Sequence, residues 1–448
     1  MSSPPVNPAV ASGRLSPAEY AHNFADAHPP LTPVQALLEA ERCYYCFDAP
    51  CTIACPTGID IPSFIARIAQ GNLRGAARTI LEDNILGGMC ARVCPTEVLC
   101  EQACVRCTQE DKPVEIGLLQ RHATDAYFAQ PGAPLFTRAA PNGQRVAVVG
   151  AGPAGLACAH RLAMLGHAVT LFDAQPKLGG LNEYGLATYK TVDGFAQKEI
   201  DWLLSIGGIE VKPKHRLGRD MTLDALVRDF DAVFLGLGLA GVNALGLGAE
   251  AEAASRAAVD FIAALRQAES PASVPVGRRV LVLGGGMTAV DAAVQSRLLG
   301  AEEVSIVYRR GPEAMPASGH EQRWAQHHGV TLRHWAAPRQ LLLTDGRVSG
   351  MRFVRTRLEG AKLVETGESF ELPADVVLRA IGQNFVAEPI GSAIALQDGR
   401  IATDEHGHTS HPKVWAGGDC RAGGRDLTVE AVEHGKLAAI DIDRVLRA

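Results

Sequence analysis

Cysteine constrains this chain more than any other residue, because nine of its eleven cysteines fall between residues 43 and 107. They form two short runs, and each run contains a cysteine followed by proline. The runs are Cys43, Cys46, Cys51 and Cys55, then Cys90, Cys94, Cys100, Cys104 and Cys107. Such runs are typical of a module with two iron–sulfur clusters, in which the cysteine before proline often serves the other cluster. We therefore predict a chain that transfers single electrons.

A disulfide framework and a structural zinc site are the alternative interpretations of these cysteines. Disulfide frameworks are typical of short secreted chains, whereas this chain has 448 residues and starts with a polar, proline-rich segment. Zinc takes four ligands in two separated pairs, and nine cysteines exceed that number. Clusters and a reducing compartment, the cytoplasm, are the expectation. Cys158 and Cys420 are expected to be small buried hydrophobic residues.

The composition excludes several classes of function. With 47% hydrophobic and 21% charged residues the chain is an ordinary globular sequence. A net charge of −6 gives no reason to expect a nucleic-acid partner. No apolar run reaches the roughly 18 residues of a membrane span, so we expect no membrane partner.

The part of the chain that carries the cysteines has helical periodicity. Residues 1–34 are rich in proline, serine and alanine and predict a flexible arm. Thr32 followed by Pro33 predicts the start of a helix that runs to Arg42. Residues 116–128 place apolar side chains along one helical face. We therefore predict an all-α double-cluster module over residues 35–135.

A complete dinucleotide-binding fingerprint follows this module. A strand at 146–149 leads into a turn with Gly150, Gly152 and Gly155, a helix, and a second strand that ends at Asp173. The glycines allow backbone N–H groups to approach a pyrophosphate at the start of the helix, and the acidic residue binds ribose hydroxyls. Because strand, glycines, helix, strand and acid occur in this order, we predict a bound dinucleotide.

The same pattern recurs once, with a different ending. Residues 279–283 lead into Gly284, Gly286 and Ala289, and the second strand ends in Arg309 and Arg310 in place of an acid. Guanidinium groups at this point favour a 2′-phosphate, which a carboxylate would repel. The alternative interpretation is a solvated arginine pair, since arginines are common on surfaces. Two such units in one chain indicate a flavin enzyme that a nicotinamide nucleotide reduces.

A third segment supports the flavin. Residues 411–417 predict a strand, and Gly418 with Asp419 lie shortly before a helix over 427–445, where a carboxylate can contact a flavin. Two apolar segments, 232–238 and 376–382, end in glycine and predict strands that return between the nucleotide domains. The predicted fold class is α/β, with an all-α cluster module followed by two Rossmann-like domains, the second inserted in the first. The predicted boundaries are 1–34 for the arm, 35–135 for the cluster module, 136–255 and 385–448 for the FAD-binding domain, and 256–384 for the NAD(P)H-binding domain.

The order of these motifs resembles a known family. The cluster module, the turn from Gly150 to Gly155, the run from Leu178 to Leu181 and the Arg309–Arg310 pair occur in the order found in the glutamate synthase small-subunit superfamily. Within it, the chain resembles the flavin subunit of bacterial NAD-dependent dihydropyrimidine dehydrogenase. The resemblance runs from about residue 35 to the C-terminus, and the stretch from Cys90 to Cys104 is its most specific part.

The resemblance implies a set of cluster ligands. Cys43, Cys46, Cys51 and Cys104 would hold one [4Fe–4S] cluster, and Cys55, Cys94, Cys100 and Gln120 would hold the other. An amide ligand leaves a cluster with one negative charge fewer than a thiolate or carboxylate would. A glutamate is expected there in the ferredoxin–NADP transhydrogenase large subunit, so Gln120 discriminates between these relatives; the alternative interpretation is an exposed glutamine. Cys90 and Cys107 stay unassigned.

The resemblance also implies the nucleotide contacts. In the flavin site Lys190 replaces the arginine of relatives and loses its planar fork, which puts its role there in doubt. The implied flavin contacts are Ala151, Gly152, Asp173, Gly180, Leu181, Lys190, Leu217, Asp419 and Thr428. The implied nicotinamide contacts are Gly286, Thr288, Ala289, Arg309, Arg310, Ala380 and Gly382.

The function that this resemblance implies is electron input. A hydride from NADH or NADPH would reduce FAD, and single electrons would pass through two [4Fe–4S] clusters to a partner barrel subunit with FMN and further clusters, which interconverts uracil or thymine and their dihydro forms. We expect a hetero-oligomer, no catalytic side chain beyond the cofactors, and NADH as the main donor. A glutamate synthase small subunit, a transhydrogenase large subunit and a redox-inactive scaffold are the alternatives.

Overall fold

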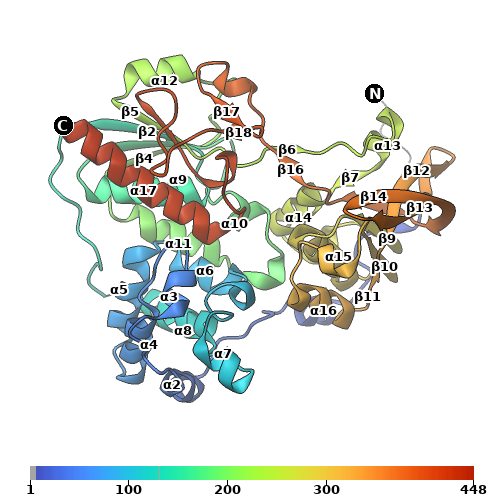
Figure 1. Ribbon diagram of the computed structural model, residues 1–448, viewed down its shortest axis with the longest axis horizontal. Helices are drawn as coiled ribbons and strands as arrows, with labels where there is room; N and C mark the ends of the chain where they lie inside the picture. The colour runs from blue at the N-terminus through green and yellow to red at the C-terminus, as the bar shows by residue number, and fades with distance from the viewer. Residues whose placement is uncertain (1–6, 131) are drawn as a thin grey trace. The chain divides into compact units, whose positions relative to one another are not determined.

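The computed structural model describes residues 7–130 and 132–448, which form two compact units (Figure 1). Unit 1 combines Tyr184–Val192 and Gly241–Asn384 with the N-terminal stretch up to Ala27. Unit 2 combines His28–Glu183, Asp193–Ala240 and Phe385–Ala448. The helix from Thr428 to Arg447 is the longest described one, and no described helix is long and apolar enough to cross a membrane.

The first part of unit 2 is the predicted helical module. Thr32 caps the first helix through the N–H of Gln35, with Pro33 at its first position, which confirms the predicted start. Ile61, Phe64, Ile65, Ile80 and Leu119 are buried in its core. The helices are α2 (Pro33–Glu41), α3 (Pro50–Ala54), α4 (Ile61–Ala69), α5 (Leu73–Asp83), α6 (Gly87–Val93), α7 (Val105–Glu110) and α8 (Ile116–Ala129).

The rest of unit 2 is a parallel α/β domain. Its sheet has the order β19-β5-β2-β3-β4, so a strand from the end of the chain pairs with one from the middle, as expected for a domain that is interrupted in sequence. Its strands are β2 (Arg145–Val149), β3 (Ala168–Phe172), β4 (Ile209–Lys212), β5 (Ala232–Leu235) and β19 (Val414–Ala416). Its helices are α9 (Pro153–Met164), α10 (Leu181–Tyr184), α11 (Phe195–Leu204), α12 (Leu223–Asp229) and α17 (Thr428–Arg447). Figure 1 shows α17 running along α9.

Unit 1 is built on a second parallel sheet, with the order β11-β10-β9-β15-β7. The strands are β7 (Arg256–Ala257), β9 (Arg279–Leu283), β10 (Glu303–Val307), β11 (Val330–Arg333) and β15 (Val376–Arg379), with helices α13 (Ala249–Ala254), α14 (Ala258–Gln267), α15 (Met287–Leu298) and α16 (Gly319–His327). An antiparallel sheet extends it, made of β12 (Ala336–Thr344), β13 (Arg347–Glu359) and β14 (Lys362–Pro373).

Two segments join unit 1 from elsewhere in the sequence. The sequence predicts a flexible arm over residues 1–34, whereas its described part contains β1 (Val10–Ala11), which pairs with β8 (Val276–Gly277), and α1 (Pro17–Asn23). Tyr184–Val192 leaves the FAD-binding part of the sequence, and its Tyr189 is buried in the core of unit 1. Short elements complete the two units: η1 (Thr96–Val98), η2 (Thr188–Lys190), β6 (Gly241–Val242), η3 (Pro271–Ser273), η4 (Pro312–Ala314), β16 (Gln383–Asn384), η5 (Glu388–Ile390), β17 (Leu396–Gln397), β18 (Arg400–Ile401) and η6 (Gly418–Cys420).

Candidate functional site

The structure brings four cysteines of the two runs around one small pocket in the helical module. These are Cys43, Cys46, Cys51 and Cys104, named here the first cysteine set. The rest of the lining is mainly apolar and includes Ile61, Ile65, Val114 and Ile116. Burial raises the pKa of Cys51 to about 11. Thiols in such surroundings become thiolates when a metal binds them, which fits a cluster.

A second group of cysteines packs beside the start of α17. Cys90, Cys55 and Cys94 share one apolar cluster with Leu427 and Val429. The pKa of Cys94 is raised well above its usual value by a hydrogen bond with Cys90, by burial and by the charges of Cys90, Cys100 and Cys55. Cys55, Cys94, Cys100 and Gln120 are named here the second ligand set.

Gln120 lies on α8 and is buried. Its Nε2 atom donates a hydrogen bond of 2.7 Å to the carbonyl oxygen of Gly87, at the start of α6. This bond fixes the orientation of the amide, and Oε1 is the atom that would bind iron if Gln120 were a ligand. A glutamate at this position would have no N–H to donate and would place a carboxylate against a carbonyl oxygen.

Among the described residues, no group of three or more His, Cys, Asp or Glu side chains is arranged to hold a single metal ion. Ligands of a four-iron cluster do not have that arrangement, because each of them binds a different iron atom. Cys107 lies in α7 and does not line the pocket of the first cysteine set.

The first glycine turn forms a tight cradle between β2 and α9. Gly150 has a φ of +99°, and a Cβ on Gly155 would lie 1.8 Å from the Gly150 carbonyl oxygen, so neither position accepts a side chain. Asp173 accepts a hydrogen bond of 2.7 Å from the backbone N–H of Ala151. Gly152 caps α9 and leaves its first N–H groups for an anion, as a pyrophosphate requires.

The other expected flavin contacts lie in unit 2, apart from Lys190. Asp419 is in η6. Burial raises its pKa to about 6, and the negative charge of Asp426 contributes to this rise. Thr428 begins α17, and its hydroxyl donates a hydrogen bond of 2.9 Å to the Oδ1 atom of Asn182, a residue that the sequence did not identify. Gly180 and Leu181 border the start of α10, Leu217 is buried, and Gly418 donates its backbone N–H to His434.

The second cradle lies in unit 1, between β9 and α15. A Cβ on Gly284, whose φ is +134°, would lie 2.1 Å from the carbonyl oxygen of Ala380, so the two expected contacts face each other. Gly286 caps α15, and the space beside it is open. Thr288 and Ala289 belong to the first turn of α15. Gly382 accepts a hydrogen bond from the backbone N–H of Asn243.

Arg309 and Arg310 follow β10 after one intervening residue, Tyr308, and both are exposed. Their backbone is fixed, because the Thr356 hydroxyl donates to the Arg309 carbonyl at 2.7 Å and the Trp335 N–H donates to that of Arg310 at 3.2 Å. Exposed guanidinium groups on a fixed backbone are suited to bind a phosphate.

Lys190 lies in unit 1, where its Nζ atom is 2.8 Å from a carboxylate oxygen of Asp291 and 2.8 Å from one of Glu321. Burial disfavours the charged ammonium, but the two carboxylates outweigh it and raise the pKa of Lys190 well above its usual value. The role expected for Lys190 at the flavin stays a prediction. Asp291 and Gln295 were not identified from the sequence, although two polar residues four positions apart in the otherwise apolar stretch 289–295 are a signal for buried partners.

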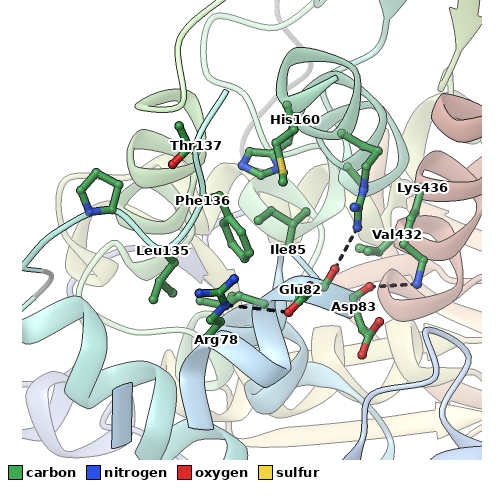
Figure 2. A pocket seen from close by; sticks show the side chains of 15 residues that line it. Arg78, Glu82, Asp83, Ile85, Leu135, Phe136, Thr137, His160, Val432 and Lys436 are labelled. Carbon is green, nitrogen blue, oxygen red and sulfur yellow. Dashed lines mark hydrogen bonds and ion pairs between the residues drawn. The ribbon is translucent and has the colours of Figure 1, made fainter. Parts of the chain in front are cut away.

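A pocket of about 420 Å³ lies elsewhere in unit 2 (Figure 2). It is lined by α5, the segment 134–137, and the later turns of α9, including His160. Figure 2 shows Lys436 directed at Asp83, whose backbone carbonyl accepts its hydrogen bond at 3.1 Å. Because α9 starts at the glycine turn and the pocket contacts its later turns, the pocket is separate from the cradle.

Two family models cover most of the chain. Residues 20–131 match "Dihydroprymidine dehydrogenase domain II, 4Fe-4S cluster". Residues 144–435 match the pyridine nucleotide-disulphide oxidoreductases. The chain belongs to this oxidoreductase family.

The relatives that match most of this chain have several names. The putative oxidoreductase UacF of Escherichia coli (strain K12) is 35% identical, over 98% of this chain and 72% of that protein. The glutamate synthase (NADPH) small chain of the same strain is 34% identical, over 93% of this chain and 92% of that one. The NAD-dependent dihydropyrimidine dehydrogenase subunit PreT of Salmonella typhimurium (strain LT2) is 34% identical, over 95% of this chain and 98% of that protein.

The fold is found in solved structures as well. FprA of Mycobacterium tuberculosis in complex with NADPH has a TM-score of 0.57 at 20% identity, over 68% of this chain and 84% of that chain. This likeness shows the fold alone. Together with the family matches it confirms the α/β fold class and the resemblance on which the sequence expectations rest.

The cofactors of this oxidoreductase are FAD, a nicotinamide nucleotide and [4Fe–4S] clusters. The residues present fit these groups, since the two cradles exclude side chains where a pyrophosphate would lie and the cysteine sets gather in the module. When bound, these groups supply hydride acceptance and single-electron transfer.

Proposed function

We propose that this chain is the electron-input subunit of a dihydropyrimidine dehydrogenase. The observation that carries the proposal is the buried Gln120, whose amide is anchored on the Gly87 carbonyl. Identity alone does not separate PreT from the glutamate synthase small chain, because both relatives are 34% identical to this chain. A neutral amide at this position favours dihydropyrimidine dehydrogenase over the transhydrogenase large subunit, for which a glutamate is expected there, and the experiment below separates the proposal from a glutamate synthase small subunit.

The packing of unit 2 supports an order for the electron path. Leu427 and Val429 lie on either side of Thr428 at the proposed flavin site, and they belong to the same apolar cluster as Cys55 and Cys94 of the second ligand set. Cys55 and Cys100 in turn share a core with Cys43, Cys51 and Cys104 of the first cysteine set. Electrons from FAD would therefore reach the cluster held by the second ligand set before the cluster held by the first cysteine set.

The surface beside the first cysteine set supports an exit to a partner. Phe47 is fully exposed and Ile53 is largely exposed, and both lie in the segment that carries Cys46, Cys51 and Cys55. The helix before it, α2, exposes Val34, Leu37 and Leu38. We propose that the FMN- and iron–sulfur-containing barrel subunit covers these side chains, in a hetero-oligomer in the cytoplasm.

The test is reconstitution. The chain is purified without oxygen, and NADH oxidation is followed with an artificial acceptor and then with uracil. We expect activity with the artificial acceptor and none with uracil until the barrel subunit of a bacterial dihydropyrimidine dehydrogenase is added. Uracil reduction by the single chain would contradict the proposal. An absence of uracil reduction after the barrel subunit is added would contradict it as well. Glutamate formation with a glutamate synthase large subunit would favour that alternative.

A further inference from the structure

Glu199 is a fully buried carboxylate of unit 2 that has no role in the proposed electron path. It lies on α11, and its Oε1 atom accepts the backbone N–H of Gly88 at 2.7 Å. The N–H of Met89 donates to the same carboxylate, at 3.2 Å to Oε2. Glu199 therefore binds the first turn of α6, more than a hundred residues away in the sequence.

This contact replaces a helix cap. Leu86, the N-cap residue of α6, has no side chain that accepts a hydrogen bond, so the free N–H groups of the first turn need another acceptor. Gly87 and Gly88 also make this turn intrinsically flexible. A Cβ on Gly88 would lie 2.5 Å from the Phe195 ring and 2.8 Å from the Glu199 carboxylate. The turn is thus shaped to accept Glu199, which holds it in place.

The turn that Glu199 holds is connected to two members of the second ligand set. The carbonyl of Gly87 accepts the hydrogen bond of Gln120, and Cys94 is the C-cap residue of α6. A shift of the first turn would therefore move the anchor of the Gln120 amide. It would also move the helix that carries Cys94.

We propose that Glu199 is a positioning residue for the cluster held by the second ligand set, acting through the first turn of α6. The inference rests on the ligand set in the proposed function. It adds that a residue of the FAD-binding part of the sequence determines how Gln120 presents its oxygen to iron. Glu199 itself does not bind the cluster.

The charge of Glu199 provides a readout that a purely structural role would not give. Burial raises its pKa to about 8, against the opposing effects of the Gly88 N–H and of Arg92. Asp125 on α8, which pairs with Arg92, raises the pKa of Glu199 further, and burial keeps His160 on α9 neutral. Cys90 on α6, Arg121 on α8 and Arg161 on α9 are the next ionisable groups on these helices. Because ionised Glu199 adds a negative charge, the potential of this cluster should fall as the pH rises from 7 to 9.

The experiment compares Glu199→Ala and Glu199→Gln with Asp201→Asn, an exposed control on the same helix. Gln120→Ala identifies which electron paramagnetic resonance signal belongs to the second ligand set. FAD content and the thermal midpoint report whether each variant is folded. Redox titrations at pH 7 and pH 9 give the potential of each cluster.

We expect Glu199→Ala to change the signal and potential of the cluster that Gln120→Ala identifies, and to leave the other cluster as in the wild type. Glu199→Gln should remove the pH dependence of that potential. Unchanged signals in folded Glu199→Ala would overturn the positioning role, and if that variant does not fold, a retained pH dependence in Glu199→Gln would overturn it. Unchanged signals in Gln120→Ala would instead overturn the ligand set of the proposed function, and this role with it.

Discussion

The Nζ atom of Lys190 lies 2.8 Å from a carboxylate oxygen of Asp291, inside unit 1. Lys190 is in the segment Tyr184–Val192, which precedes the nucleotide part of unit 1 by about fifty residues of sequence. Asp291 also accepts the backbone N–H of Ala187 at 3.2 Å. This carboxylate therefore ties the segment to α15, the helix that starts at the nicotinamide cradle.

Replacement of Lys190 by methionine tests the strength of this tie. The variant keeps the length of the side chain but leaves Asp291 and Glu321 buried without their cation, and breaking a buried pair in this way costs about 3–5 kcal/mol. We expect a lower midpoint of urea-induced unfolding for the phase that belongs to unit 1. Lys362→Met, at an exposed position of the same unit, is the control and should leave the midpoint unchanged.

Features that depend on consecutive residues were predictable from the sequence, whereas contacts between distant residues were not. The two glycine cradles were predictable because strand, turn and helix are consecutive, and Gly150 or Gly284 has a conformation that few other residues adopt. The cap at Thr32 was predictable for the same reason. Lys190 was expected at the flavin because the resemblance gives positions, whereas its two carboxylate partners lie more than a hundred residues further along the chain.

Buried polar side chains were the least predictable part of the site. In the sequence, Glu199 has the pattern of an exposed polar position on an amphipathic helix. In the structure it is buried and accepts a hydrogen bond from Gly88. The hydrogen bond from Gln120 to Gly87 could not be derived either, because both partners come from separate helices. Such pairs depend on packing that has no signature in a short stretch of sequence.

Gln120→Glu tests whether the carbonyl of Gly87 selects an amide. Glutamate adds a negative charge beside the cluster and loses the N–H that Gly87 accepts, so we expect a lower potential for this cluster while FAD remains bound. Redox titration with electron paramagnetic resonance measures the effect. Gln102→Glu, an exposed position of the same module, should behave as the wild type. A potential equal to that of the wild type would count against Gln120 as a ligand.

Glu199 makes stability depend on pH, with a sign that follows from its raised pKa. Its pKa is about 8 in the folded protein and about 4.3 when unfolded. Between these values the folded protein keeps a proton that the unfolded chain releases. The free energy of unfolding therefore falls as pH rises, by at most about 1.4 kcal/mol per pH unit for this group. The thermal midpoint of Glu199→Gln should decline less between pH 5 and 8 than that of the wild type, and parallel declines would refute the assignment.

Phe47→Ser tests the proposed exit surface. The side chain is fully exposed in the single chain, so the substitution should leave stability and NADH oxidation with an artificial acceptor within about twofold of the wild type. Loss of a large aromatic anchor at an interface costs about 2 kcal/mol or more, so electron delivery to the barrel subunit should need at least a tenfold higher concentration of partner. Leu358→Ser, an exposed position of unit 1, is the control.

The choice of nicotinamide nucleotide is tested at Arg309 and Arg310. Both guanidinium groups are exposed on a fixed backbone and suit a 2′-phosphate. The relative PreT, however, is named as NAD-dependent. We therefore predict NADH as the main donor, with measurable NADPH use. A hydrogen bond to a charged group contributes about 1.5–3 kcal/mol. Replacing both arginines by alanine should therefore lower kcat/KM for NADPH at least about tenfold and leave the NADH value within about twofold. Steady-state rates with both donors decide the matter: dominant NADPH activity in the wild type that disappears in the double variant would show that the arginines define an NADPH enzyme.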